Sequence, residues 1–142
     1  MRQDMSLETC FDLYGDQVSP ELMTRLRADL DTEISSIELR TGMEVMWRNL
    51  KGQGMKLAIC SNLALPYGPP LLDKLPSPPD VTILSYELGF IKPEPEIYHA
   101  VAKRLDLSPS EILFTGDTQL ADVDGPRLAG MQSIHITEFE TL

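Results

Sequence analysis

The sequence predicts an α/β fold in which helices cover a parallel β-sheet. Short apolar runs of strand length alternate with segments of helical spacing along most of the chain. Two of these runs end in small polar or acidic residues, at Ser61-Asn62 and at Thr115-Gly116-Asp117. In an open parallel sheet, ligands bind at the carboxyl ends of the strands. With 142 residues, the chain is long enough for one core and too short for two.

The N-terminal part is predicted to be helical and broken by turns, from Leu7 to Leu39. Ser19 supplies an N-cap and Pro20 the first helical position for a helix that runs from Glu21 to about Ser35. A second helix is expected after Gly42. Its apolar face, at helical spacing and more typical of a core than of a cofactor site, consists of Met43, Met46, Trp47 and Leu50.

Four strands are expected between these helices and the C-terminus: Lys56–Cys60, Val81–Ser85, Ile112–Phe114 and Ser133–Thr137. Residues 65–79 carry six prolines and should form a surface connection with at most a short helix near Leu71 to Leu75. A loop stiffened by two prolines then leads into a helix from Glu96 to Leu105. This alternation indicates parallel pairing of the strands.

Composition narrows the class of partner. The formal charge of −10 and the pI near 4.5 argue against nucleic acid or an anionic membrane surface as the main partner. No apolar run reaches the roughly 18 residues of a membrane span, and the N-terminus lacks the pattern of a signal peptide. We therefore expect a cytoplasmic protein. Cys60 is expected in the core and Cys10 cannot be placed, and neither they nor His99 and His135 have metal-ligand spacing.

Carboxylates gather after the third predicted strand, at Asp117, Asp122 and Asp124. Up to three of them can converge on one small volume beside Gly116. Oxygen ligands of this kind suit a hard cation, Mg²⁺ before Ca²⁺. The alternative is that Asp117 caps the next helix and that the other two lie on a solvated face.

Four pieces of the chain, in order, resemble the haloacid dehalogenase superfamily of hydrolases: Leu57–Asn62, Gly89–Tyr98, Gly116–Thr118 with Asp122, and Leu128–Met131. The resemblance covers roughly Ser36 to the C-terminus, and its most specific piece is Lys-Pro-x-Pro-x-Ile-Tyr, which begins at Lys92. It implies a Rossmann-like parallel sheet. Residues 1–38 would then be a partial helical cap segment and residues 39–142 the α/β core.

The resemblance also implies a reaction. In this family an aspartate attacks a phosphoryl group, and water hydrolyses the aspartyl-phosphate that forms. By resemblance, Ser61 and Asn62 contact the phosphoryl oxygens, Lys92 neutralises charge on the nucleophile, and Asp117 and Asp122 hold Mg²⁺. The acidic pair favours a phosphatase of small phosphorylated molecules over a dehalogenase.

One motif of the family is not found. Its nucleophile ends an apolar strand in the pattern Asp-x-Asp-Gly-Thr, and the look-alike Asp29-Leu30-Asp31-Thr32 follows a segment with helical spacing. Residues Leu7 to Ser35 instead resemble the later half of the family's helical cap. The first part of a family member is thus expected to be absent, which would leave the chain alone without catalysis.

The nucleophile strand of the family lies between the strands that here end at Ser61 and Gly116. We consider three ways in which this gap in the sheet could be closed: by a segment of the N-terminal region, by direct pairing of the two strands, or by a strand from a second copy or a partner chain. Three functions stay open as well. They are an incomplete hydrolase, a pseudoenzyme that serves as a protein-binding or regulatory module, and a plain Mg²⁺- or phosphate-binding domain.

Overall fold

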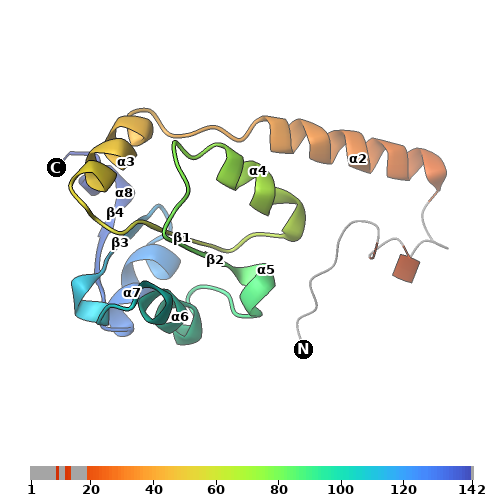
Figure 1. Cartoon of the computed structure of the whole chain (residues 1–142). Coiled ribbons are helices and arrows are strands. Elements are labelled where there is room, and N and C mark those ends of the chain that lie inside the picture. The colour runs from red at the N-terminus through yellow and green to blue at the C-terminus, as the bar shows by residue number, and fades with distance from the viewer. Residues whose placement is uncertain (1–8, 10–11, 14–18, 142) are drawn as a thin grey trace.

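The computed structural model describes residues 9, 12–13 and 19–141, and it shows an α/β arrangement (Figure 1). The strands are β1 (Ala58–Ser61), β2 (Val81–Leu84), β3 (Leu113–Gly116) and β4 (Gln132–His135). The longer helices are α2 (Pro20–Ser35), α3 (Met43–Gly52) and α6 (Pro95–Leu105). Shorter turns and helices connect them: η2 (Leu65–Tyr67), α4 (Gly68–Asp73), α5 (Ser85–Leu88), η3 (Pro109–Glu111), η4 (Gln119–Asp124), α7 (Gly125–Leu128) and α8 (Ile136–Phe139).

The helices predicted near the N-terminus are confirmed where the structure describes them. The Ser19 Oγ accepts a hydrogen bond from the backbone N–H of Leu22 at 3.2 Å, so it caps α2 as its position in the sequence predicts. In α3, Trp47 is buried and its indole N–H donates to the Ser77 Oγ at 2.9 Å. That bond satisfies the one polar group of the indole and joins α3 to the proline-rich connection.

The strands pair in parallel, as predicted, but in two separate pairs. β1 pairs with β2, from Ala58 opposite Val81, and β3 pairs with β4, from Leu113 opposite Gln132. Within residues 19–141 no strand pairing joins β1 to β3, although β1 lies between β2 and β3 in Figure 1. The hypothesis that these two strands pair directly is therefore wrong for the described part of the chain.

The core lies where α6 packs against the strands. Tyr98 of α6 is fully buried, and its ring meets the ring of Phe114 edge to face at 5.6 Å between centroids. Each fully buried large apolar side chain of this kind contributes about 1.5–3 kcal/mol relative to exposure. The other buried members of the cluster are Val81, Ile83, Ile97, Val101, Ala102, Leu105, Ile112, Ala129 and Met131.

The bounds of several elements differ from the prediction. The first strand begins at Ala58 instead of Lys56, and the third ends at Gly116 instead of Phe114. The last strand ends at His135 instead of Thr137, because the His135 Nδ1 accepts from the Thr137 N–H and so caps α8. The second strand stops before Ser85, which begins α5. In the proline-rich connection, α4 begins at Gly68, since its prolines occupy the first turn, where a missing N–H costs nothing.

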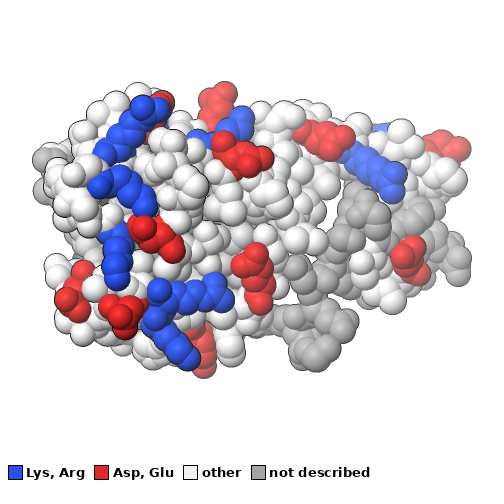
Figure 2. All heavy atoms as spheres, viewed as in Figure 1, with Lys and Arg blue, Asp and Glu red and all other residues white. Residues whose placement is uncertain are grey.

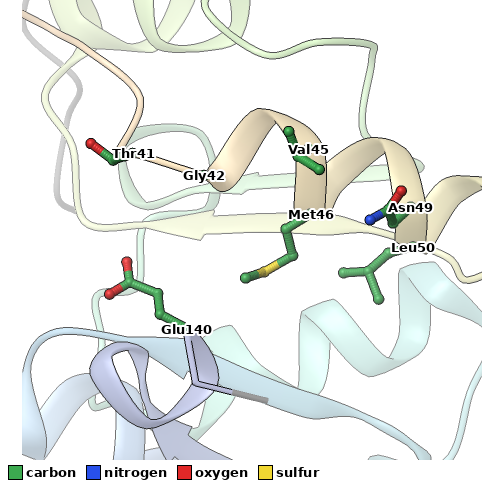
Figure 3. A pocket seen from close by; sticks show the side chains of 7 residues that line it. All are labelled: Thr41, Gly42, Val45, Met46, Asn49, Leu50 and Glu140. Atoms are coloured by element: carbon green, nitrogen blue, oxygen red, sulfur yellow. The ribbon is translucent and has the colours of Figure 1, made fainter.

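A pocket of roughly 600 Å³ lies between α3 and α8 (Figure 3). Met46 and Leu50 point from α3 into it, and Glu140 lies across from them. None of the five predicted site residues lines it. On the face drawn in Figure 2, basic and acidic side chains are interspersed. Among the helices of the described residues, none combines the length and apolarity needed to cross a membrane.

Candidate functional site

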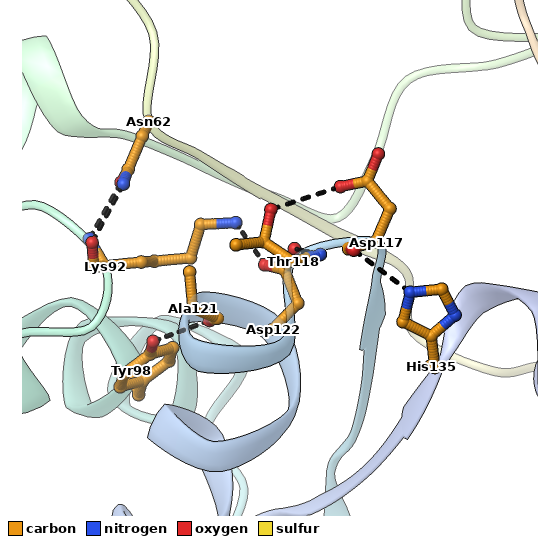
Figure 4. Close-up of polar contacts among 8 residues, drawn as sticks. All are labelled: Asn62, Lys92, Tyr98, Asp117, Thr118, Ala121, Asp122 and His135. Atoms are coloured by element: carbon orange, nitrogen blue, oxygen red, sulfur yellow. Dashed lines mark hydrogen bonds and ion pairs between the residues drawn. The ribbon is translucent and has the colours of Figure 1, made fainter.

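Lys92 and Asp122 form a buried ion pair at the carboxyl ends of the strands (Figure 4). The Lys92 Nζ lies 2.5 Å from the Asp122 Oδ1, and the two side chains are only 11% and 5% exposed. The ammonium group also lies 5.5 Å from the centre of the Phe114 ring. The site therefore contains a buried ammonium group in direct contact with a buried carboxylate.

The turn η4 holds Asp122 in this position. The Asp122 N–H donates to the Thr118 carbonyl at 2.7 Å, and the Thr118 N–H donates to the Asp122 Oδ2 at 3.0 Å. Both carboxylate oxygens thus have partners. The carboxylate also lies directly against Gly116, where an added Cβ would come within 2.4 Å of the Asp122 Cγ. Only glycine at position 116 lets β3 and this carboxylate come so close.

Asn62 fixes the backbone of Lys92. Its Nδ2 donates to the Lys92 carbonyl at 2.9 Å, and the Lys92 N–H donates to the Asn62 Oδ1 at 2.8 Å. This two-way contact binds the loop after β1 to the loop that carries Lys92. Ser61, the last residue of β1, lies directly before Asn62 and is half-buried. The contact with Lys92 gives Asn62 a positioning role, while its predicted contact with a phosphoryl group stays a prediction.

Asp117 is the exposed carboxylate of the site. It follows β3 directly, and its Oδ1 accepts from the Thr118 Oγ1 at a long 3.4 Å. Its backbone carbonyl accepts from the His135 Nε2 at 3.0 Å. Asp124 accepts from the Gln119 Nε2 instead. In the part of the chain that the structure describes, no group of three or more His, Cys, Asp or Glu residues could hold a metal, so the predicted convergence of three carboxylates is wrong.

The donor set nevertheless fits a weakly bound Mg²⁺. This cation keeps several waters and is commonly bound by one or two carboxylates together with substrate phosphate oxygens. Asp117 offers a free carboxylate for direct contact. Asp122, with both oxygens engaged, adds negative charge and can act through water.

The charges of the site also affect the pKa values of groups in β1 and near α8. Burial raises the pKa of the Cys60 thiol to about 11, and the charge of Asp122 adds to this rise while Lys92 opposes it. At the periphery, the Arg40 guanidinium bonds the Glu140 carboxylate at 2.8 Å and lowers its pKa, with a smaller contribution from His135. Glu140 in turn raises the pKa of Arg40, and Asp117 adds slightly.

The five predicted residues all lie near the carboxyl ends of β1 and β3. Lys92 contacts both Asn62 and Asp122, Ser61 is the last residue of β1, and Asp117 directly follows β3. The residue that sequence reasoning missed is His135. It ends β4 just as Ser61 ends β1, so the same rule about strand ends could have found it.

The model of the haloacid dehalogenase-like hydrolase family matches residues 10–130 of the chain. The chain therefore belongs to the haloacid dehalogenase-like hydrolases, which confirms the predicted family.

Curated relatives are phosphatases. Over 90 residues the chain is 32% identical to a phosphoglycolate phosphatase of Salmonella paratyphi A. The matched region covers 62% of this chain and 35% of that protein. Over 54 residues it is 37% identical to a glyceraldehyde 3-phosphate phosphatase of Methanopyrus kandleri, which covers 38% of this chain and 23% of that protein. The chain thus matches about a quarter to a third of the length of these relatives.

Solved structures show the same fold. A haloacid dehalogenase family phosphatase from Thermococcus onnurineus superimposes with a TM-score of 0.63 at 25% identity, over 89% of this chain and 57% of that one. A haloacid dehalogenase family enzyme of Bacteroides thetaiotaomicron, in complex with magnesium and inorganic phosphate, gives a TM-score of 0.67 at 20% identity, over 90% of this chain and 65% of that one. The predicted fold class, a partial Rossmann-like sheet of the haloacid dehalogenase type, is confirmed.

Proposed function

We propose that this chain carries the phosphoryl-binding and Mg²⁺-binding part of a phosphatase site, and that the described residues alone do not complete the reaction. The observation that carries the proposal is the buried Lys92–Asp122 pair beside the free carboxylate of Asp117. Burying a charge pair is costly. A fixed cation of this kind at the ends of strands is suited to an anion that must be bound and oriented.

Each residue has a distinct part in this proposal. Lys92 attracts and orients the phosphoryl group, and Asp122 and Asn62 keep the ammonium group in place through the contacts described above. Ser61 donates its hydroxyl proton to a phosphoryl oxygen. Asp117 holds Mg²⁺, with Asp122 contributing through water. When bound, Mg²⁺ supplies charge neutralisation that lowers the repulsion between the phosphate and an attacking carboxylate.

Small phosphorylated molecules are the proposed substrates. The curated relatives carry the names of phosphatases for phosphoglycolate and glyceraldehyde 3-phosphate, both small monophosphate esters. The enzyme of Bacteroides thetaiotaomicron was crystallised with magnesium and inorganic phosphate. These names support the class of substrate, and the choice among its members depends on residues outside the site.

Within the described strands and the loops that follow them, we assign no residue as the nucleophile. The family's reaction needs one carboxylate for the metal and another for the attack, and among Asp117, Asp122 and Asp124 only Asp117 is exposed. Asp29 lies exposed in the middle of α2, so the structure does not place it at the end of a strand. A further stretch, Asp12-Leu13-Tyr14-Gly15, shares the first aspartate and the glycine of the family motif and lies near the start of the family match.

We further propose that an added strand completes the sheet. β1 and β3 each pair on one side only within the described residues, and the Thr115 hydroxyl of β3 is buried without a hydrogen-bond partner. Backbone N–H and C=O groups left without partners favour the addition of a strand. A parallel strand between them would end beside Ser61 and Asp117. A segment of the N-terminal region, a second copy of the chain or a partner chain is the proposed source.

Hydrolysis of an aryl phosphate tests the phosphatase proposal. The 142-residue protein is assayed with and without Mg²⁺ beside Asp117→Asn, and the substitutions Asp12→Asn and Asp29→Asn are assayed in parallel. The proposal predicts turnover at the buffer rate for all four proteins. It also predicts that the wild type binds phosphate in a Mg²⁺-dependent way. Of the three variants, only Asp117→Asn should weaken this binding.

Turnover that requires Mg²⁺ and disappears in Asp117→Asn would keep the phosphatase and overturn the lack of activity. Loss of turnover in Asp12→Asn or in Asp29→Asn would then identify the nucleophile. If the protein neither turns over the ester nor binds phosphate, the phosphatase site itself is rejected.

A second function, a pseudoenzyme that binds another protein chain, is favoured by one observation. β1 and β3 each have one side that no other strand of the described residues pairs with, and such a side can accept an extended peptide segment. Sedimentation velocity over a hundredfold range of protein concentration tests it for a second copy. Self-association without any binding of phosphate would favour this function over the first.

A further inference from the structure

We propose that His135 is a positioning residue that fixes Asp117 and thereby sets the affinity of the site for a divalent cation. The inference deepens the proposed function and rests on it. No motif of the sequence assigned His135 a role, and the structure connects it to Asp117 by a direct hydrogen bond (Figure 4).

Asp117 has little to hold its side chain. The ladder between β3 and β4 ends with Gly116 opposite His135, so Asp117 is the first residue beyond the paired strands. Its carboxylate is exposed, and the 3.4 Å contact with the Thr118 hydroxyl is long for an O–H···O bond. The direction of the carboxylate therefore depends on how the Asp117 backbone is held.

His135 holds that backbone from the neighbouring strand. Its Nε2 lies 3.0 Å from the Asp117 carbonyl oxygen. Because a carbonyl oxygen only accepts, Nε2 must carry the hydrogen. Figure 4 shows the Asp117 carboxylate pointing away from the imidazole ring, so His135 does not itself face the ligand. The bond continues the strand ladder by one step, with a side chain in place of a backbone group.

Thr137 fixes the ring from its other side. With the hydrogen on Nε2, the His135 Nδ1 is an acceptor. It lies 2.8 Å from the Thr137 Oγ1 and 3.4 Å from the Thr137 N–H. The ring is thus held between α8 and the loop after β3. A cation ligand positioned in this way is sensitive to its supporting partner, and loss of such a partner typically lowers metal affinity roughly 10- to 100-fold.

Manganese binding, followed by the loss of the free Mn²⁺ signal in electron paramagnetic resonance, tests the inference without any turnover. We expect His135→Ala to weaken Mn²⁺ binding about tenfold or more. His135→Gln, whose Nε2 amide can still donate to the Asp117 carbonyl, should stay within about threefold of the wild type. The matched control is His99→Ala, since His99 is the other histidine and lies exposed on α6.

Two results would overturn the inference alone: wild-type affinity in His135→Ala, or an equal loss in His135→Gln and His135→Ala. If His135→Ala does not fold, Thr137→Val decides, because it removes the hydroxyl that holds the ring and should weaken binding by a smaller factor. Unchanged affinity in Thr137→Val would then reject the role. If Asp117→Asn binds Mn²⁺ as well as the wild type, the proposed metal site fails and His135 with it.

Discussion

Lys92 and Asp122 form the most deeply buried ion pair among the described residues. Their side chains are 11% and 5% exposed, whereas Lys51 and Asp80 form an ion pair of similar length with 28% and 39% exposure. Solvent screens an exposed pair and makes its net contribution small. The buried pair cannot lose one partner without leaving the other charge without compensation.

The substitution Lys92→Met should therefore destabilise the fold strongly. It keeps the apolar stem and removes the ammonium group, so Asp122 would be left buried and charged. We expect a loss of about 3–5 kcal/mol in the free energy of unfolding, measured by urea denaturation. Lys51→Met, at the exposed pair, is the control and should cost much less. Equal losses in the two variants would contradict the assignment of a buried pair.

Gly116 is the second residue whose identity the site requires. Gly116→Ala would place a Cβ against the Asp122 carboxylate, which must then shift away from Lys92. Overpacking of this kind costs about 1–3 kcal/mol. We expect reduced stability to urea and weaker phosphate binding. Gly52→Ala, at the end of α3 with nothing within 4 Å of the added Cβ, should leave phosphate binding unchanged and should not lower the stability to urea. Wild-type phosphate binding in Gly116→Ala would contradict the proposed role of the close contact between Gly116 and the Asp122 carboxylate.

For single residues, the sequence predicts which side chains belong to the site better than it predicts their contacts. Lys92, Asp117 and Asp122 can be found from strand ends and from the family resemblance. That the Asn62 amide faces the backbone of Lys92 depends on two loops meeting, 30 positions apart, which no local pattern encodes. The contact from His135 to Asp117 likewise depends on the register of β3 and β4.

Among the elements, regular helices are predicted well and strand ends are not. Apolar spacing and the Ser19 cap place α2 correctly, because helix signals are local. The end of β4 is set by the contact of His135 with Thr137, and the wide turn η4 by the fit of Asp122 against Gly116 and Lys92. Both depend on packing between elements, so periodicity does not show them.

The strand β1 carries a titration that can be measured. Cys60 has a pKa of about 11, raised from 9.0 by burial. An unfolded thiol ionises near pH 9, whereas the folded one keeps its proton to about pH 11. The stability that comes from the neutral thiol is therefore complete below pH 9 and is lost as the pH rises through about 11.

We expect the alkylation rate of Cys60, in a Cys10→Ser background, to stay low at pH 9 and to rise toward pH 11. The same protein in concentrated urea should react with a midpoint near the ordinary thiol pKa, which serves as the control. A folded midpoint at or below pH 9 would show that Cys60 is not shielded by the core.

Across the residues that the structure describes, the strands form two pairs that do not join. We propose that the partial cap segment is residues 1–38 and the α/β core residues 39–142. The alternation of strands and helices predicts the parallel pairs but not their separation, because strand order depends on contacts across the sheet. The hypothesis of an added strand follows from the sides of β1 and β3 that no other described strand pairs with.

Hydrogen exchange measured by mass spectrometry tests this proposal at two protein concentrations. At low concentration we expect the segments 58–61 and 113–116 to exchange faster than residues 97–105 of the buried helix α6. At high concentration a strand from a second copy should slow exchange in both segments and leave α6 unchanged. Exchange that does not vary with concentration would exclude a second copy as the source.

Calorimetric titration of inorganic phosphate into the protein with and without Mg²⁺, beside Asp117→Asn, tests whether Lys92, Asp117 and Asp122 form a phosphate and Mg²⁺ site. We expect saturable phosphate binding that Mg²⁺ strengthens in the wild type. This Mg²⁺ effect should be lost in Asp117→Asn, because the exposed carboxylate is gone. Phosphate binding that is absent, or that Mg²⁺ changes equally in both proteins, would contradict the assignment of Lys92, Asp117 and Asp122 to a phosphatase site.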